Sequence, residues 1–399
     1  MAKPKGNLLI VSLILFLGVL VFGYFYPFSA PLIPKVQKPE PIPEPIVQLD
    51  TIQPKIDSIL KRYNTKTYFN GSVLVAYKGK VIHRSHYGYG NLRPKKILTD
   101  SSIFQLASVS KQFTAAAILI LIDENKLKLT DQLRDFFPQM PYDGITVKHL
   151  LNHTSGLPQY FWFADHVWKS DTPPTNLQMI EVMSQNEMPP FFAPGQKFEY
   201  SNTGYFLLAS IVEKVSGMSF SEFLKVKIFE PLKMTQTYVY TYPFDSIRPV
   251  QLMGYQISRR GRARELPPFL NDGIYGDKNV YSTTKDLYLW LKGLNEGKII
   301  SSKSLKLMYT QGQTNSGWKA PYGMGFRLEN RDGENVIYHN GKWNGFRTSV
   351  KNYIDYDLWI IVLNHTSYRN VSGIVKSIKE HLKQELVSHN NQGKKKNQN

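Results

Sequence analysis

The stretch Phe104-Gln-Leu-Ala-Ser-Val-Ser-Lys-Gln-Phe-Thr-Ala-Ala-Ala-Ile-Leu119 carries most of the information in this chain. Its polar start, with Ser108 and Lys111, runs into an apolar, alanine-rich segment that predicts a buried helix over 112–122. Side chains three residues apart on a helix lie on the same face. A serine hydroxyl becomes nucleophilic when a base removes its proton, and burial lowers the pKa of a lysine enough to make it that base. The stretch therefore predicts Ser108 as a nucleophile and Lys111 as its base.

The Ser-x-x-Lys spacing alone is not specific, because it occurs four times, at Ser58, Ser108, Ser282 and Ser316. Ser58 falls on the polar face of a predicted helix, Ser282 lies beside a predicted helix cap, and Ser316 lies in a loop that contains glycine. At Ser108 the lysine stands at the start of an apolar helix, where an unneutralised charge is costly. The Ser108 N–H would also lie at a helix N-terminus, which favours an oxyanion. An ordinary N-cap serine is the alternative.

Tyr-x-Asn is also frequent, with five occurrences, but Tyr200-Ser-Asn202 leads into an apolar helix and so belongs to a loop that enters the core. A tyrosine at such a point can carry a proton between the serine and a leaving group. Asn202 can contact Lys111 and a substrate carbonyl. The alternative is a loop tyrosine whose hydroxyl lies in water.

The hydrophobic pattern predicts an α+β fold. It indicates terminal helices, a mainly helical middle, and strands near both ends of the folded region. Helices are expected over 51–63, 147–152, 204–215, 284–294 and 370–387. Strands are expected over 71–77, 80–86, 322–328, 336–339, 347–352 and 358–364. We therefore expect one antiparallel sheet flanked by the terminal helices, a helical lobe, and an active site between the two.

Composition narrows the function classes. The chain has 399 residues and a formal net charge of +18, but its positive residues are spread out and no nucleic-acid motif accompanies them, so no nucleic-acid partner is expected. A basic surface facing anionic envelope polymers is the simpler interpretation. There is no cysteine, which excludes disulfides, thiolate metal sites and cysteine nucleophiles. The polar residues 389–399 predict a disordered tail.

No metal or cofactor is expected. His149 and His153 are four residues apart, as zinc ligands can be, but no third ligand accompanies them, so packing is the preferred interpretation. The aromatic residues from Tyr160 to Trp168 either line a substrate pocket or pack in the core, and core packing is preferred.

The N-terminus predicts a membrane anchor over residues 1–28. Lys3 and Lys5 precede the apolar residues 8–28, which are long enough to cross a bilayer, and this charge places the remainder outside. Phe28 and Pro31 flank the candidate cleavage site and disfavour cleavage. The proline-rich residues 29–48 predict an extended spacer, so the catalytic domain is expected over 49–388. The expected location is a bacterial inner membrane, with the catalytic domain on the extracytoplasmic side.

Five segments, in the same order, resemble class C β-lactamases and related penicillin-binding proteins, a family that includes D-alanyl-D-alanine carboxypeptidases, D-amino-acid peptidases and esterases. The resemblance runs in order over about residues 68–365. The first segment is the Ser108 stretch quoted above. The others are Leu150-Leu-Asn-His-Thr-Ser-Gly-Leu-Pro158, Glu199-Tyr-Ser-Asn-Thr-Gly-Tyr205, Tyr281-Ser-Thr-Thr-Lys-Asp-Leu287 and Tyr338-His-Asn-Gly341. The resemblance implies the β-lactamase/transpeptidase fold.

The resemblance also implies catalytic roles. Ser108 attacks the substrate and is acylated, Lys111 and Tyr200 move its proton, and Asn202 binds substrate. The N–H groups of Ser108 and Lys342 would form the oxyanion hole.

The third motif supplies further expected substrate contacts. His339, Asn340 and Gly341 would line the edge of the cleft, with His339 donating to a substrate carboxylate, and Gln159 and Tyr160 would supply contacts from the helical lobe. The motif also departs from the family pattern. His339 replaces the lysine of β-lactamases and Asn340 replaces the usual Thr or Gly, which weakens the case for a dedicated antibiotic hydrolase.

The favoured function is a membrane-anchored serine hydrolase that forms an acyl-enzyme with amide or ester substrates, above all peptidoglycan-type D-amino-acid peptides. An esterase on the same scaffold and a non-catalytic penicillin-type sensor are the alternatives.

Overall fold

The computed structural model describes residues 49–241, 252–331 and 333–396. One large compact unit spans Gln48–Val387. The predicted anchor over 1–28 and the spacer over 29–48 lie outside the described residues. Within the described ranges, no helix has both the length and the apolar character that a membrane crossing requires.

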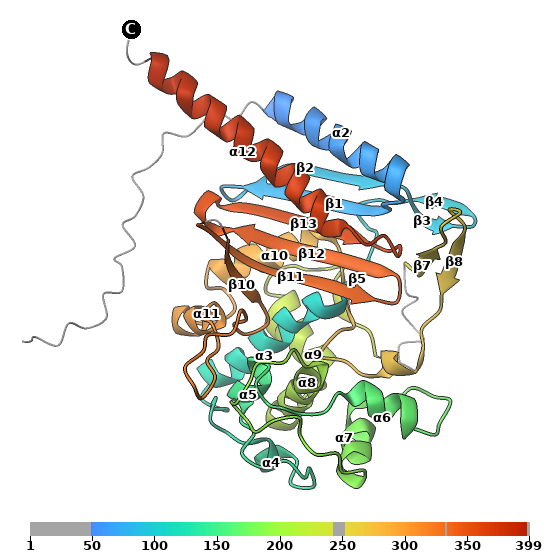
Figure 1. Cartoon of the computed structure of the whole chain (residues 1–399), viewed down its shortest axis with the longest axis vertical. Helices are drawn as coiled ribbons and strands as arrows, with labels where there is room; N and C mark the ends of the chain where they lie inside the picture. Colours follow the sequence, from blue (N-terminus) through green and yellow to red (C-terminus); the bar gives the residue numbers. More distant parts are fainter. Residues whose placement is uncertain (1–48, 242–251, 332, 397–399) are drawn as a thin grey trace, which may run out of the picture. The chain divides into compact units, whose positions relative to one another are not determined.

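A six-stranded antiparallel sheet forms one lobe, in the order β10-β11-β12-β13-β1-β2 (Figure 1). β1 (Gly71–Tyr77) pairs along its full length with β13 (Leu358–Asn364), so strands from the two ends of the folded region meet at the centre. The other strands are β2 (Lys80–Tyr87), β10 (Arg327–Arg331), β11 (Glu334–Trp343) and β12 (Phe346–Tyr353). This confirms the predicted antiparallel sheet built from both ends of the folded region, and the short strands form three smaller sheets beside it.

The terminal helices α2 (Leu49–Thr67) and α12 (Val371–Lys396) lie on one face of this sheet (Figure 1). Ile52, Ile56 and Leu60 of α2 recur every four residues and are buried, which explains why this segment forms an amphipathic helix. α12 continues to Lys396 and so extends into the segment from residue 389 for which the sequence predicts a disordered tail. Extending an existing helix avoids the cost of nucleation.

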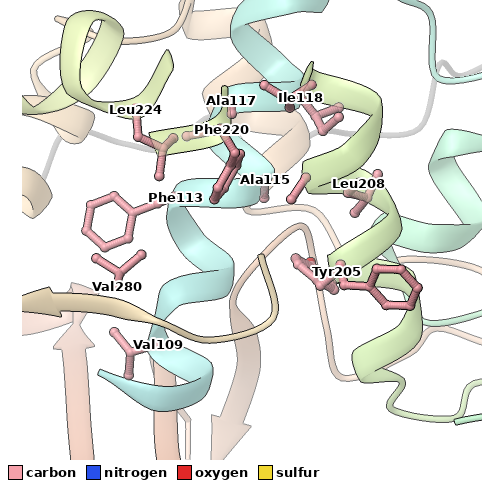
Figure 2. Close-up of a cluster of buried hydrophobic side chains, with 14 of the residues drawn as sticks. Val109, Phe113, Ala115, Ala117, Ile118, Tyr205, Leu208, Phe220, Leu224 and Val280 are labelled. Carbon is pink, nitrogen blue, oxygen red and sulfur yellow. The ribbon is translucent and has the colours of Figure 1, made fainter. Parts of the chain in front are cut away.

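The second lobe is mainly helical. At its centre α3 (Lys111–Asp123) packs against α8 (Asn202–Ser216), and Figure 2 shows Ala115 and Ile118 beside Tyr205 and Leu208. The alanines of α3 let the two helices approach closely. The remaining helices are α4 (Leu133–Phe136), α5 (Val147–Leu151), α6 (Tyr160–His166), α7 (Asn176–Gln185), α9 (Phe220–Leu224), α10 (Thr284–Asn295) and α11 (Ser302–Met308).

The remaining elements are short. The single-turn helices are η1 (Ala107–Ser110), η2 (Lys225–Phe229), η3 (Leu270–Gly273) and η4 (Ile354–Tyr356). The short strands are β3 (Tyr89–Leu92), β4 (Lys95–Ile97), β5 (Phe104–Gln105), β6 (Tyr238–Val239), β7 (Gly254–Ile257), β8 (Ala263–Leu266) and β9 (Val280–Ser282).

One predicted strand is misplaced, because β10 begins at Arg327 rather than at residue 322. The preceding residues form a turn in which Gly325 has a φ of 78°, a left-handed value that favours glycine. A Cβ on Gly325 would lie 2.8 Å from the Lys111 carbonyl oxygen. The turn therefore packs against the start of α3 and places Arg327 close to it.

Candidate active site

Ser108 lies in the single turn η1, immediately before α3, at the start of the helix that the sequence predicts. Ala107 has a φ of 51°, which is strained for a residue with a side chain. Ala107 and Val109 are buried, whereas Ser108 is half-exposed. The bend at Ala107 thus presents the Ser108 hydroxyl to solvent while its neighbours stay in the core.

Lys111 begins α3 and is completely buried. Its Nζ lies 2.8 Å from Asn202 Oδ1, 2.8 Å from the Asp277 carbonyl oxygen and 3.3 Å from Ser108 Oγ. A neutral lysine has two N–H donors and one lone pair. The two oxygens at 2.8 Å can only accept, so they take both donors. The lone pair of neutral Lys111 is left for the Ser108 hydroxyl proton.

The environment of Lys111 favours the neutral form. Burial is the largest effect and, with the nearby Arg327 cation, it lowers the pKa of Lys111 to about 7, although the Asp277 carboxylate opposes the shift. A base with a pKa near neutrality is largely deprotonated at physiological pH and still accepts a proton readily. Lys111 therefore meets the electrostatic requirement for activating Ser108.

Tyr200 is placed to act as an acid rather than as a base. Burial raises the pKa of its hydroxyl, and the opposing effects of Ser108 and Arg327 do not cancel this shift. The hydroxyl forms no hydrogen bond of standard length with any described residue, so its interaction with Ser108 is a longer-range one. A neutral phenol beside the nucleophile can donate a proton to a leaving group.

The pH profile tests this assignment. We expect kcat/KM to fall below an apparent pKa of about 7 as Lys111 becomes protonated. Because the Arg327 cation lowers the pKa of Lys111, Arg327→Gln should raise it and move the acid limb to higher pH. Initial rates between pH 5 and 9 measure the acid limb of the wild type and that of the Arg327→Gln variant. Arg134→Gln, which removes a surface cation paired with Asp143, is the charge-matched control. If the acid limb of the Arg327→Gln variant stayed in place or moved to lower pH, Lys111 would not be the group that titrates there.

A cavity of about 690 Å³ opens over Ser108 and Tyr200 and is bordered by β11. β10 pairs with β11 only as far as Tyr338. From His339 to Trp343 that edge of β11 therefore has no strand partner among the described residues. An unpaired edge presents alternate backbone N–H groups, which can stabilise an oxyanion. The predicted role of the Lys342 N–H is consistent with this position and stays a prediction.

Gly341 sets the distance between β11 and the nucleophile turn. A Cβ at this position would lie 2.3 Å from the Leu106 carbonyl oxygen and 2.2 Å from Thr348 Oγ1. Thr348 Oγ1 itself donates to the Leu106 carbonyl at 2.7 Å, which ties β12 to the same turn. Only glycine permits so close an approach of the two backbones.

We therefore expect Gly341→Ala to reduce kcat by about 10²- to 10³-fold, because the added methyl group separates the two halves of the oxyanion hole. Kinetics with an activated ester and thermal unfolding measure the two consequences separately. Gly79→Ala is the control, since Gly79 has a φ of 70° and open space around it in a turn of the same sheet. It should lower the melting temperature without lowering kcat. A Gly341→Ala protein with wild-type kcat would refute the close-approach argument.

The comparisons with known proteins identify the family. A family model described as Beta-lactamase matches residues 56–384.

The chain belongs to the beta-lactamase family.

Penicillin-binding protein 4* of Bacillus subtilis (strain 168) is 35% identical over 321 residues, which cover 78% of this chain and 71% of that protein. Protein flp of Staphylococcus aureus (strain MW2) is 28% identical over 84% of this chain and 67% of that protein. Among solved structures, the octameric penicillin-binding protein homologue from Pyrococcus abyssi is similar, with a TM-score of 0.70 and 29% identity over 80% of this chain and 75% of that chain. With the Ser108 and Lys111 geometry, this membership makes the chain a serine hydrolase.

The second motif of this beta-lactamase family member is held by the helical lobe. Ser201 caps α8 by accepting the Gly204 N–H, which fixes Tyr200 and Asn202 at the helix start. Gln159 donates to the Tyr200 carbonyl and accepts the Asn202 N–H, each at 3.3 Å. Gln159 thus positions the motif, and the structure shows no separate substrate-binding role for it.

The structure does not support the predicted substrate contact of Tyr160. Its side chain is fully buried, and its hydroxyl accepts a hydrogen bond from Lys278 at 2.7 Å and donates to the Asp277 carboxylate at 3.2 Å. Asp277 in turn offers its backbone carbonyl to Lys111. Tyr160 therefore braces the turn that supports the active-site lysine.

His339 borders the cavity but does not have the donor that the sequence predicts. Its Nδ1–H donates to the Asn340 carbonyl at 2.8 Å, so its Nε2 accepts from Tyr322, which lies 3.1 Å away. Burial and the Lys111 charge lower the pKa of His339 to about 3, so the ring is neutral. Because both nitrogens are occupied and uncharged, the predicted donation to a substrate carboxylate is not supported.

Asn340 also turns away from the nucleophile. Its Oδ1 accepts from Ser349 Oγ at 2.8 Å, and strand alternation puts its side chain on the opposite face from Gly341. The part of the third motif that approaches Ser108 is therefore Gly341 and the β11 backbone. The polar side chains of His339 and Asn340 are bonded to other residues.

Sequence reasoning missed two residues. Arg327 borders the cavity with its guanidinium 5.1 Å from the Tyr200 ring centroid, and Asp277 supplies the second acceptor for Lys111. Arg327 follows a turn that was mistaken for a strand, and the contribution of Asp277 is a backbone carbonyl, which no side-chain motif reveals.

The predicted packing role of His153 agrees with its contacts. The ring is buried between the Tyr200 and Tyr322 rings, with centroids 4.3 Å and 4.4 Å away, and its Nδ1 accepts the Ser201 N–H. Within the described ranges no three His, Cys, Asp or Glu side chains gather as metal ligands would.

Proposed function

We propose that this chain hydrolyses amide or ester bonds through an acyl-enzyme on Ser108, with peptidoglycan-type D-amino-acid peptides as its principal substrates. The observation that carries the chemistry is the hydrogen-bonding of Lys111. Two carbonyl-type acceptors use its N–H groups, which leaves its lone pair for the hydroxyl of Ser108.

In the acylation step Lys111 takes the Ser108 proton while Oγ bonds to the substrate carbonyl carbon. The developing oxyanion accepts hydrogen bonds from the N–H groups of Ser108 and Lys342. When the carbon–leaving-group bond breaks, the Tyr200 hydroxyl protonates the departing nitrogen or oxygen, and Lys111 returns the proton to Tyr200. The ester is then hydrolysed by the reverse sequence with water as the nucleophile.

The relatives support the substrate class. Two of the three compared proteins are described as penicillin-binding, and the family that the motifs resemble includes D-alanyl-D-alanine carboxypeptidases. His339 is neutral and therefore a poor partner for a substrate carboxylate. The Arg327 guanidinium borders the same cavity and takes that role in the proposal. The esterase alternative shares the same machinery and differs only in what the cavity accepts.

The proposal includes anchoring through residues 8–28, with the catalytic domain outside the cytoplasm. The apolar length of that segment and the preceding Lys3 and Lys5 support it. Release of the full chain from membranes by alkaline carbonate would count against the anchor.

The substrate question is decided by giving the full chain, in detergent, three compounds: fluorescent penicillin, a peptide ending in D-alanyl-D-alanine, and 4-nitrophenyl butyrate. Intact mass and peptide mapping locate any adduct. A penicillin adduct on Ser108 together with D-alanine release supports the proposal. Ester turnover without D-alanine release supports the esterase. A penicillin adduct with turnover of neither substrate supports the sensor, and no adduct with any compound refutes the acyl-enzyme.

A further inference from the structure

A buried group of charges next to Lys111 has no part in the acylation steps described above. Lys278 and Asp277 are each 2% exposed, and Asp272 is 4% exposed. We call Lys278, Asp277 and Asp272 the buried charge cluster. A buried ion pair is a weak source of stability, because the loss of hydration offsets much of the attraction between the charges. The cluster is therefore better explained by what it holds in place.

Lys278 has an acceptor for each of the three N–H donors of an ammonium group. Its Nζ lies 2.7 Å from the Tyr160 hydroxyl, 2.9 Å from the Ile274 carbonyl oxygen and 3.5 Å from Asp277 Oδ1. Burial lowers the pKa of Lys278, but the carboxylates of Asp277 and Asp272 oppose that shift. Three acceptors around one amine suit the charged form, so Lys278 is a cation held on three sides.

The peptide group between Asp277 and Lys278 supports the catalytic base. Its carbonyl, which belongs to Asp277, accepts a hydrogen bond from Lys111 Nζ at 2.8 Å. The Asp277 carboxylate accepts from Tyr160 at 3.2 Å. The side chains on both sides of this peptide group are therefore anchored. Their anchoring fixes the direction of the carbonyl and, through it, the orientation of the Lys111 amine.

The buried charge cluster also holds the end of β11. Trp343 directly follows Lys342, whose N–H is the predicted second oxyanion donor. The Trp343 indole N–H donates to the Asp272 carboxylate, and Lys278 Nζ lies 4.8 Å from the centroid of the Trp343 ring. A cation at this distance from an indole ring is attracted to it. These contacts tie the sheet lobe to the turn that carries the Lys111 acceptor.

We infer that Lys278 is a positioning residue for this hydrolase, because its cluster holds the carbonyl acceptor of Lys111 and the end of β11 in one fixed arrangement. Lys278 acts through these groups and is not among the described residues that line the cavity. A misplacement of about 1 Å at a catalytic group can reduce the rate about 10²-fold, so an anchor at this point has a large effect. The inference rests on the proposed function, because Ser108 and Lys111 must perform the acylation.

The charges of the cluster also act on the protonation of Lys111. The titratable groups that face Lys111 are Asp277 and Lys278 on the turn, Arg327 on β10, Tyr200 and Tyr205 at the start of α8, and the rings of His153 and His339. Burial keeps the two tyrosines and the two histidines neutral near pH 7, since it raises the pKa of the former and lowers the pKa of the latter. The Asp277 carboxylate raises the pKa of Lys111, whereas repulsion from Arg327 and Lys278 lowers it.

Two single variants should therefore move the pH profile in opposite directions. With 4-nitrophenyl butyrate between pH 5 and 9, Lys278→Met should lower the plateau kcat about 10- to 100-fold, because the anchor is lost. Its acid limb should move to higher pH by about one unit, because the Asp277 carboxylate then acts on Lys111 without the opposing cation. Asp277→Asn keeps the backbone carbonyl and a side-chain acceptor for Tyr160, but it removes the carboxylate charge. Its acid limb should move to lower pH.

The double variant Asp277→Asn/Lys278→Met removes one charge of each sign and so avoids the unpaired Asp277 carboxylate that Lys278→Met leaves in the core. Its acid limb should return toward the wild-type position, while its plateau kcat stays about 10-fold or more below the wild type. Circular dichroism and thermal unfolding confirm that each variant is folded. Lys379→Met is the control, since it breaks a partly buried ion pair with Glu334 at the other end of β11. It should lower the melting temperature and leave the acid limb and kcat unchanged.

Trp343→Phe tests the connection to β11 separately. Phenylalanine keeps a ring to stack on Phe269, whose centroid lies 5.1 Å from that of Trp343, but it cannot donate to Asp272. The plateau kcat should fall several-fold and the acid limb should stay in place, because no charge changes. Wild-type kcat in this variant overturns the coupling to β11.

The pH profiles and the plateau rates together decide the role of Lys278. Acid limbs that stay in place in both single variants overturn the inference, because a purely structural role lowers the rate without moving the limb. A wild-type plateau kcat in the double variant overturns it too, and so does a double variant that fails to fold, since the cluster would then serve only the fold. Each of these results leaves the serine hydrolase in place if the wild type turns over the ester. Absence of wild-type turnover, together with no penicillin adduct, refutes the proposed function and this inference with it.

Discussion

Ser108→Ala is expected to abolish turnover, with a loss of about 10⁶-fold in kcat when a nucleophile is removed from an intact catalytic group. No neighbouring hydroxyl can replace it. Ser110, two residues later, is buried, and its Oγ accepts the Val280 N–H at 3.0 Å on the far side of the turn. The residual rate would come from substrate binding and the oxyanion hole alone. Ester hydrolysis and intact mass during turnover provide the measurement.

The chain contains its own controls for this experiment. Ser58→Ala and Ser316→Ala remove serines that have a lysine three residues later, and both serines are exposed. Their activity should match the wild type, because neither serine lies by a buried lysine. If Ser108→Ala retained substantial hydrolysis or still formed an acyl adduct, Ser108 would not be the nucleophile.

Lys111→Met is expected to reduce kcat by about 10⁴-fold, which corresponds to the loss of a positioned general base. Methionine fills a similar unbranched volume in the buried site but has no basic lone pair for the Ser108 proton. The acid limb near pH 7 should disappear as well, because the group that titrates there is gone. The change in profile separates a lost base from a disturbed fold, which would lower the rate at every pH.

Lys61→Met is the matched control, since Lys61 follows Ser58 at the same spacing on an exposed helix face. It should keep both the rate and the acid limb. A Lys111→Met protein that retained the limb near pH 7 would assign that ionisation to another group. The lowered pKa values of the neutral residues His153 and His339 place their titration well away from it.

Much of the site was predictable from local sequence. Ser108, Lys111, Tyr200 and Asn202 come together as expected, because the apolar helix after Ser108 had to be buried and therefore carried Lys111 into the core. The strand pairing of both chain ends followed from the same reasoning, since β1 and β13 are apolar on both faces and need a central place in the sheet.

The predicted substrate contacts were not supported where a residue's role depends on its hydrogen-bond partners from other segments. Tyr160 and Gln159 lie beside the second motif in space, but their polar atoms are used by Lys278, Asp277 and the Tyr200 loop, and nothing in the local sequence indicates those partners. His339 was expected to be a free donor, yet Tyr322 and the Asn340 carbonyl occupy both of its nitrogens.

The sequence by itself predicted the candidate nucleophile, its lysine and the sheet that supports them, because these predictions depend on periodicity and on the burial of apolar runs. Only the tertiary structure decided the environment that lowers the pKa of Lys111 and the position of Arg327 beside the cavity. Each of these depends on distances between segments that are far apart in the chain, and electrostatic energies and hydrogen bonds are set by such distances and by the solvent excluded between the groups.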